Sequence, residues 1–234
     1  MSIVAESGEK PVQRSSIYVY EAPLRLWHWI NALSIVVLAV TGYLIAHPLP
    51  SMPGEASAWF VMGYIRFAHF LAAYVFGIGF LGRLYWAFVG NRHARQIFYI
   101  PFWRGTWWRE VGHEVLWYAF IAARPKKYIG HNPLAQLAMF FLFTLLAVFM
   151  ILSGGAMYAE GEGAGSWQSR VFGWFGALFV NTQNLHTWHH LGLWAVVVFV
   201  IVHIYAAVRE DIVSRQSIIS TMISGERMFK DDAE

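Results

Sequence analysis

Residues 185–208 read LHTWHHLGLWAVVVFVIVHIYAAV, an apolar stretch that is long enough to cross a bilayer as a helix. Histidine is costly inside a membrane helix and by default marks a functional site there. His189 and His203 lie fourteen positions apart in this stretch. A helix separates their rings by roughly 21 Å along its axis and turns them to within about 40° of each other. The stretch therefore predicts one membrane helix with an imidazole near each membrane surface.

The composition of the whole chain is typical of a membrane protein. Of its 234 residues 57% are hydrophobic and 13% are charged, whereas a soluble domain carries roughly 25% charged residues. The sequence contains no cysteine, which excludes disulfides, iron–sulfur clusters and thiolate ligation of haem by this chain. The net charge of +3 is small and gives no support to nucleic-acid binding. We expect an integral membrane protein that lies in a lipid bilayer.

Three more apolar segments are long enough to span a membrane. They cover residues 26–46, 60–89 and 133–152. His47-Pro48-Leu49-Pro50 should stop the first helix, and Ser153-Gly154-Gly155 should end the third. With 185–208 these segments predict an all-α fold, an up-and-down four-helix membrane bundle that forms a single domain over residues 1–234.

The basic residues are distributed unevenly among the loops. The loop between the second and third spans is rich in arginine and lysine, whereas residues 47–60 contain neither. By the positive-inside rule, this basic loop and both termini are cytoplasmic. The tryptophan-rich segment 98–122 should form an amphipathic helix on the inner membrane surface, and 166–180 should lie on the outer surface.

The topology sorts four histidines into two pairs of similar depth. His28 and His203 fall near the cytoplasmic ends of the first and fourth spans. His69 and His189 fall near the outer ends of the second and fourth. Each pair comes from two different helices, the arrangement that axial ligation of two b-type haems inside a bundle requires. The sequence therefore predicts two haem b groups, one near each membrane surface.

Other interpretations of the histidines remain open. A single membrane histidine is more often a hydrogen-bonded core residue than a ligand, and zinc would need more ligands than either pair offers. His186 lies one turn before His189 and is the rival for the outer ligand. His190 points about 100° away from His189 and cannot face the same haem. We expect the histidines in or beside the basic loop to be solvated: His93, His113 and His131.

Several polar residues near the paired histidines are candidates for supporting roles. Arg25 and Arg66 flank ligand positions and could pair with haem propionates, since arginine binds carboxylates bidentately. Arg209 is better explained as an interfacial anchor. Reduction of a quinone would need an apolar slot with groups that deliver protons, and Asn31 and His113 are the candidates near the inner haem.

Two motifs resemble a known family. Residues 25–30, RLWHWI, followed by 38–42, LAVTG, resemble the first-helix signature of the b-type cytochrome subunit of nickel–iron hydrogenases. Residues 186–191, HTWHHL, followed by Trp194, Phe199 and His203, resemble the fourth-helix signature of that family. The resemblance extends over the whole chain in length, number of spans and orientation.

The resemblance implies a function and partners. The chain would be the dihaem membrane anchor of a hydrogenase, with His28 and His203 as ligands of the cytoplasmic-side haem and His69 and His189 as ligands of the outer one. Its partners would be the iron–sulfur small subunit and, through it, the large subunit that cleaves hydrogen on the periplasmic side of the bacterial inner membrane. We expect this chain to transfer electrons to the quinone pool of a respiratory chain and not to cleave hydrogen itself.

Two other classes of protein remain as alternatives. The first is the cytochrome b subunit of a formate dehydrogenase or thiosulfate reductase type complex, which has the same bundle and ligands but another partner. The second comprises proteins without a redox cofactor, either a transporter or a bare membrane anchor. Spans one, two and four contain no carboxylate between their ends, and no span is interrupted in the manner of transporter binding sites.

Overall fold

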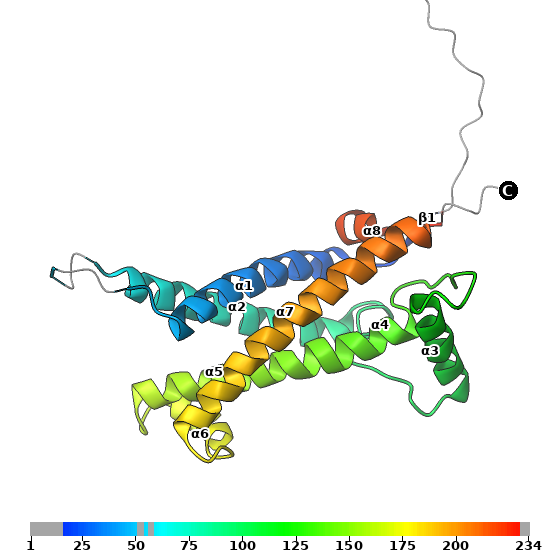
Figure 1. The fold of residues 1–234 in the computed structure, drawn as a ribbon. Coiled ribbons are helices and arrows are strands. Elements are labelled where there is room, and N and C mark those ends of the chain that lie inside the picture. The colour runs from blue at the N-terminus through cyan, green and yellow to red at the C-terminus, as the bar shows by residue number, and fades with distance from the viewer. Residues whose placement is uncertain (1–15, 51–53, 56–58, 230–234) are drawn as a thin grey trace, which may run out of the picture.

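Four long helical rods run side by side in the computed structural model, which describes residues 16–50, 54, 55 and 59–229 (Figure 1). Three are single helices: α1 (Ala22–Ala46), α2 (Val61–Val89) and α7 (Thr182–Val213). The fourth rod joins α4 (Pro133–Ala138), η2 (Met139–Leu145) and α5 (Leu146–Glu162) without a break. Each rod is long and apolar enough to cross a membrane, which agrees with the four predicted spans.

Short elements lie at the two ends of the bundle (Figure 1). One end, called the α3 end below, carries α3 (Gly105–Tyr118), α8 (Ile218–Ser224), β1 (Ser16–Tyr18) and β2 (Glu226–Met228). The other, called the α6 end, carries α6 (Trp167–Gly176) and the connection between α1 and α2. Helices α3 and α6 lie within the two segments that were predicted to be interfacial, 98–122 and 166–180.

The prediction of an all-α fold is wrong in one detail. Strands β1 and β2 form a two-stranded antiparallel sheet in which Ser16 pairs with Met228 and Tyr18 pairs with Glu226. Gly225 turns the chain from α8 into β2 with a φ of 89°, a backbone conformation that favours glycine. The two strands are separated by nearly the whole sequence, so no local pattern indicates their pairing.

The third rod continues past Ser153-Gly154-Gly155, where the sequence predicted its end. Helix α5 instead reaches Glu162. The reason is close packing: a Cβ on Gly155 would lie 2.7 Å from the Phe172 ring of α6, and a Cβ on Gly154 would lie 3.2 Å from the His189 ring of α7. The two glycines allow neighbouring helices to approach, as small residues commonly do in membrane bundles.

The middle of the third rod is a π-helix. Segment η2 has the wider turn in which each carbonyl is bonded five residues ahead, and α-helix precedes and follows it. The rod starts at Asn132, whose side chain accepts a hydrogen bond from the amide of Ala135 at 2.6 Å, and Pro133 takes the first helical position. These local signals explain why the predicted start at Pro133 was correct.

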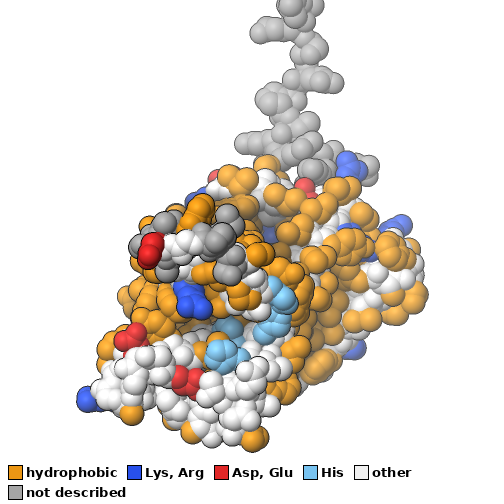
Figure 2. All heavy atoms as spheres, turned by 60° about the vertical axis from the view of Figure 1, so that its left-hand side comes forward, with side chains coloured by type: hydrophobic (Ala, Val, Ile, Leu, Met, Phe, Trp, Pro, Cys, Tyr) orange, Lys and Arg blue, Asp and Glu red, His pale blue; other side chains and the backbone are white. Residues whose placement is uncertain are grey.

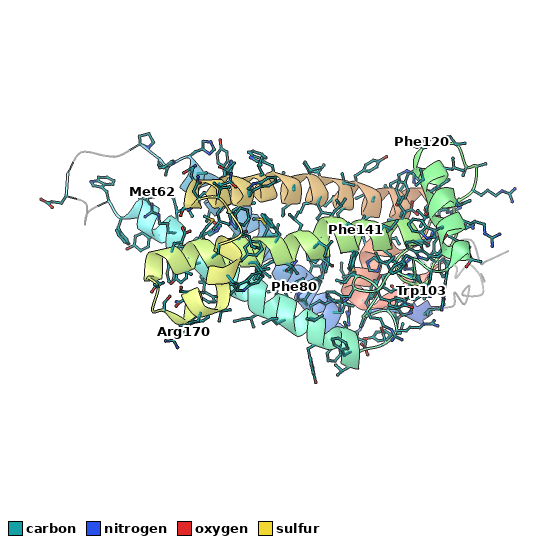
Figure 3. The ribbon with its side chains drawn as sticks, turned by 90° about the horizontal axis from the view of Figure 1, so that it is seen from below. Met62, Phe80, Trp103, Phe120, Phe141 and Arg170 are labelled. Atoms are coloured by element: carbon teal, nitrogen blue, oxygen red, sulfur yellow. The ribbon has the colours of Figure 1, made fainter. Side chains whose placement is uncertain are left out.

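The bundle is apolar on its outer face and contains polar groups inside. Large hydrophobic side chains such as Phe88 and Ile212 are exposed, as lipid contact requires. Phe76, Phe80 and Ala147 form a buried cluster at the centre, where Figure 3 shows Phe80 between the rods. Several polar side chains are also buried, among them Asn31, Ser153 and Arg83. In a membrane protein such groups need internal partners or mark functional sites.

Candidate haem-binding sites

The structure brings His28 and His203 together near the α3 end. His28 lies near the start of α1 and His203 lies near the end of α7. Their ring centres are 6.3 Å apart and the ring planes meet at 46°. A metal lies about 2 Å from a bound imidazole nitrogen, so two rings on opposite sides of one iron have centres about 6 Å apart. The separation of this pair therefore fits bis-histidine ligation of a haem iron.

The surroundings of this pair contain polar atoms that lack partners. Nδ1 of His28, Nε1 of Trp27 and Oδ1 of Asn31 are all buried without a hydrogen bond. On the other side, Phe199 stacks on the ring of His203 with centres 5.6 Å apart. Buried polar groups are rarely left unpaired in native proteins. Flat aromatic walls with unpaired polar atoms fit a planar group that has polar substituents, as haem does.

The second pair of histidines lies toward the α6 end. His69 comes from the first half of α2 and His189 from the first half of α7, so both lie nearer to the α6 end than the first pair does. Each ring lies beside a glycine of a neighbouring helix. A Cβ on Gly42 would lie 3.3 Å from Cε1 of His69, and one on Gly154 would lie 3.2 Å from Cε1 of His189. The glycines keep space open at this pair.

A hydroxyl group holds each histidine of the second pair. Oγ1 of Thr41 lies 2.9 Å from Nδ1 of His69, and Oγ of Ser153 lies 2.7 Å from Nδ1 of His189. Each hydroxyl donates its own proton to the carbonyl four residues earlier, at Val37 and at Phe149. The hydroxyl oxygen must then accept from the histidine Nδ1–H. This leaves Nε2 without a proton, the form in which a histidine binds a metal.

The same arrangement therefore occurs twice, on α1 and on α5. In each case a hydroxyl residue followed by a glycine faces a histidine: Thr41-Gly42 for His69 and Ser153-Gly154 for His189. The contacts of these two hydroxyls with histidines were not predicted from the sequence. The sequence signal for these contacts was a hydroxyl residue directly followed by glycine in two otherwise apolar helices. Helix packing explains the glycine but not the hydroxyl.

The rival ligand His186 is exposed, whereas His189 is partly buried. His190 instead faces His47, with ring centres 5.7 Å apart, and Tyr43 stacks on His47 at 4.6 Å. Figure 2 views this end of the molecule and shows histidine side chains among hydrophobic ones at its surface. The structure thus favours His189 over His186 as the partner of His69, and it places His190 on a different side of α7.

The two arginines predicted to contact propionates lie in different environments. Arg25 donates to the carbonyl of Ile223 on α8. Arg66 is exposed near the start of α2. A third arginine, Arg83, is 3% exposed near the end of α2 and packs against Trp27, the neighbour of His28. Arg83 was not among the predicted site residues, although residues 75–89 of α2 contain no other charged side chain and a charge in an apolar membrane helix marks a functional candidate.

The quinone candidates Asn31 and His113 lie on separate helices, and no hydrogen bond joins them in the described part of the chain. Asn31 is buried on α1, three residues after His28. His113 is on α3, where its Nδ1 lies 3.4 Å from Glu114. Burial raises the pKa of Glu114, an effect that the hydrogen bond from His113 opposes. Only Asn31 borders one of the paired histidines.

The expectation that the loop histidines are solvated is wrong for two of them. His93 is 6% exposed, and burial lowers its pKa. His131 lies beside Tyr20, with 3.1 Å between Nδ1 and the phenol oxygen, and burial lowers the pKa of His131 to about 3. The loop folds back onto the α3 end and covers these side chains. The predicted anchor Arg209 is buried as well, in contact with Glu210 at 3.2 Å.

The fold and the paired histidines define a membrane-bound b-type cytochrome, and comparison with known proteins agrees. Residues 19–225 match the model of a family described as prokaryotic cytochrome b561, and the chain belongs to that family. It is 66% identical to a probable Ni/Fe-hydrogenase B-type cytochrome subunit of Azotobacter vinelandii, over 97% of this chain and 95% of the relative. It is 50% identical to the probable Ni/Fe-hydrogenase 1 B-type cytochrome subunit of Escherichia coli (strain K12), over 92% of each.

These comparisons confirm the resemblance that the two sequence motifs indicated. The chain is a member of the group of hydrogenase B-type cytochrome subunits, a multi-pass membrane protein whose cofactor is haem b. A cytochrome family is also evidence against the cofactor-free transporter and the bare anchor.

Proposed function

We propose that this chain is the dihaem membrane-anchor subunit of a nickel–iron hydrogenase and that it passes electrons to the membrane quinone pool. His28 and His203 hold one haem, and His69 and His189 hold the other. The observation that carries the proposal is the 6.3 Å separation of the His28 and His203 rings, which suits two axial ligands on one iron. Haem b supplies one-electron chemistry when bound.

The protein would hold the two sites in line along α7. His189 and His203 are on the same helix, roughly 21 Å apart along its axis. At each site two histidines would hold the haem, and no further protein ligand would be needed. The haem would supply one-electron transfer, and the apolar helices around the histidines would provide surroundings of low dielectric. These features suit electron transfer and not substrate turnover at the iron.

The orientation supports a partner outside the membrane. The α3 end includes the arginine- and lysine-rich connection between α2 and α4 and both described chain ends, which β1 and β2 join. By the positive-inside rule this end faces the cytoplasm. The His69 and His189 site then lies toward the periplasm, where the iron–sulfur small subunit would donate electrons and the large subunit would cleave hydrogen. The membrane would be the bacterial inner membrane.

The quinone would react near the His28 and His203 site. Asn31 supports this placement because it is buried close to His28 and its Oδ1 has no partner. A hydroxyl of a reduced quinone is a donor of the kind that this oxygen lacks. His113 remains the second candidate, as a group at the α3 end that can exchange protons with water.

The test is a dithionite-reduced minus oxidised optical spectrum of the purified full chain, with a haem-to-protein ratio. We expect low-spin b-type bands at about two haems per chain. His28→Ala and His69→Ala should each remove one haem and leave the other. His47→Ala is the matched control, because His47 is an exposed histidine at the α6 end outside both pairs.

Each alternative result has a clear meaning. Wild-type protein that is folded but contains no haem would overturn the proposal. A ratio of one haem would show that one pair is not a ligand pair, and the variants would identify which. Hydrogen-driven reduction of the bound haem, measured after addition of the partner hydrogenase, then tests the electron path itself.

A further inference from the structure

Arg83 is a buried cation at the α3 end of α2. Its side chain is 3% exposed, and its guanidinium carbon lies 5.4 Å from the centre of the Trp27 ring and 5.2 Å from that of Phe98. Phe80, which Figure 3 labels, lies almost one turn earlier on α2 and packs on the same Phe98 at 6.1 Å. The guanidinium is therefore enclosed by aromatic rings in the interior of the bundle.

Most of the hydrogen-bonding capacity of Arg83 is unused. Nη2 donates to the carbonyl of Ala94, which fixes the loop after α2. Nε and Nη1 are buried and have no hydrogen-bond partner among the residues that the structure describes. Among the described residues, no carboxylate forms an ion pair with Arg83. A buried charge without a counter-charge is costly, so proteins rarely retain one unless it binds something.

Arg227 is another buried arginine at this end, and unlike Arg209 it forms no ion pair among the described residues. Arg227 on β2 is 2% exposed and its Nη1 donates to the carbonyl of Tyr128 at 3.2 Å. Its charge reaches Tyr20, as does that of Arg83. Glu210 compensates Arg209 at this end, but Arg83 and Arg227 are buried without an ion pair among the described residues, and an anion beside Arg83 would balance its charge.

The unpaired donors point to where that anion lies. Nε1 of Trp27 is buried without an acceptor, and the Trp27 ring lies against the guanidinium of Arg83. Trp27 directly precedes His28 in the sequence. Together, Trp27 and Arg83 offer three donor nitrogens without a partner among the described residues, beside a histidine of the first pair. Nη2 of Arg83 retains a second N–H, which with a neighbouring guanidinium nitrogen matches the two oxygens of a carboxylate.

We propose that Arg83, with the indole of Trp27, binds a propionate carboxylate of the haem held by His28 and His203. This inference rests on the proposed function. We prefer Arg83 to Arg25 as the propionate contact at this site. Both arginines donate to a backbone carbonyl and have a buried Nε without a partner among the described residues, but Arg83 is almost fully buried and its Nη1 is unpaired as well. The propionate also gives the buried charge of Arg83 a counter-charge that the described part of the chain does not provide.

The experiment is a redox titration of both haems in the purified full chain, at several pH values. Arg83→Gln removes the positive charge, and Arg83→Lys keeps it but loses the bidentate geometry. Arg170→Gln is the matched control, because Arg170 is an exposed arginine on α6, at the other end of the bundle, and has no assigned role at either haem. Haem content is measured for every variant, so that loss of the cofactor is separated from a shift of its potential.

We expect Arg83→Gln to lower the midpoint potential of one haem and to leave that of the other unchanged. Loss of a nearby cation destabilises the reduced form, which has one more electron. The same potential should become more dependent on pH, because an uncompensated propionate takes up a proton more readily. Arg83→Lys should shift this potential less than Arg83→Gln does, and Arg170→Gln should shift neither potential.

The shifted haem must be the one held by His28 and His203. In the His69→Ala background, which retains that haem alone, Arg83→Gln should still produce the shift. Unchanged potentials and haem content in folded Arg83→Gln protein would overturn the inference, as would a shift confined to the other haem. A change only in the phospholipid that copurifies would also overturn it and would assign the anion to a lipid headgroup. Absence of haem from the wild type would instead overturn the proposed function.

Discussion

Oγ of Ser153 lies 2.7 Å from Nδ1 of His189, and the contact joins the third rod to the fourth. Thr41 makes the matching contact to His69 from α1 at 2.9 Å. Each hydroxyl fixes the proton of its histidine on Nδ1, because its own proton is committed to a helix carbonyl. The first pair differs, since Nδ1 of His28 has no partner. The two sites therefore hold their histidines by different means.

Replacing Thr41 by valine keeps its shape and removes the acceptor for His69. Partners of this kind typically contribute about 10–100-fold to metal affinity, so Thr41→Val should lose the haem at this site more readily on dilution or heating. Ser34→Ala is the control, because the Ser34 hydroxyl is also buried on α1 and also bonds a helix carbonyl, but contacts no histidine. Equal haem retention in the two variants would contradict the role assigned to Thr41.

An added methyl group at Gly154 would push the His189 ring away from its position. The Cβ would lie 3.2 Å from Cε1, closer than an ordinary contact, and overpacking of this kind costs about 1–3 kcal/mol. We expect Gly154→Ala to reduce haem content at the His69 and His189 site, and Gly42→Ala to do the same from the other side. Gly77→Ala is the control on α2, where a Cβ meets no atom within 4 Å. The readout is the haem-to-protein ratio.

The stability of the α3 end should fall at acidic pH because of His131. Burial, aided by the charge of Arg227, lowers the pKa of His131 to about 3, whereas an unfolded histidine titrates near pH 6.5. Between these two pH values His131 is protonated in the unfolded chain and neutral in the folded protein. Stability is thus complete above about pH 6.5 and decreases as the pH falls toward 3. Thermal unfolding at pH 7.5 and pH 5 should show a smaller loss for His131→Gln than for wild type, and equal losses would contradict the argument.

Helix α3 is attached to the bundle through Glu210. Its Oε1 accepts from the indole of Trp117 at 2.8 Å and lies 3.2 Å from Nη1 of Arg209. Glu210→Ala leaves the buried guanidinium without its counter-charge, which typically costs about 3–5 kcal/mol. The protein should unfold at lower temperature, and protease should cleave near α3 sooner. Glu160→Ala, at an exposed carboxylate that contacts Thr182, should change neither.

The four membrane helices were predictable because the length and apolar composition of a segment are enough to identify a membrane span. The start of the third rod at Pro133 and the end of α1 before His47-Pro48 were also predictable, because proline favours the first position of a helix and disrupts its interior. The end at Gly154-Gly155 was mispredicted because glycine has two uses, to end a helix or to let another helix approach. Only the neighbouring ring of Phe172 distinguishes them. The pairing of β1 with β2 depends on contacts across the whole chain.

The depth of each histidine in the membrane could be predicted from its position along its helix. The side-chain contacts between helices could not, because they depend on how each helix is rotated about its axis. His28 and His203 could be paired by depth alone, and the structure places their rings 6.3 Å apart. The contacts of Thr41 and Ser153 depend on which way each helix faces. Apolar helices surrounded by lipid give little sequence pattern for that direction, because lipid-facing and core-facing residues are both hydrophobic. For the same reason the sequence does not show that Arg83 faces Trp27 and Phe98 inside the bundle.

The π-helix at Met139–Leu145 shows that the number of residues in the third rod determines which of its side chains face α7. One residue more or less in an α-helix turns everything after it by about 100°. The wider turn absorbs one such extra residue before the chain reaches Ser153. A deletion of Leu142 alone, an exposed residue in this turn, would convert it to regular α-helix and leave Ser153 and Gly154 facing α7. A deletion of Val148 in α5, where no wider turn can absorb the change, would rotate Ser153 and Gly154 away from α7 by about 100°. An insertion or deletion in the α-helical part of this rod can therefore turn Ser153 and Gly154 away from His189, although no amino acid at the site has changed.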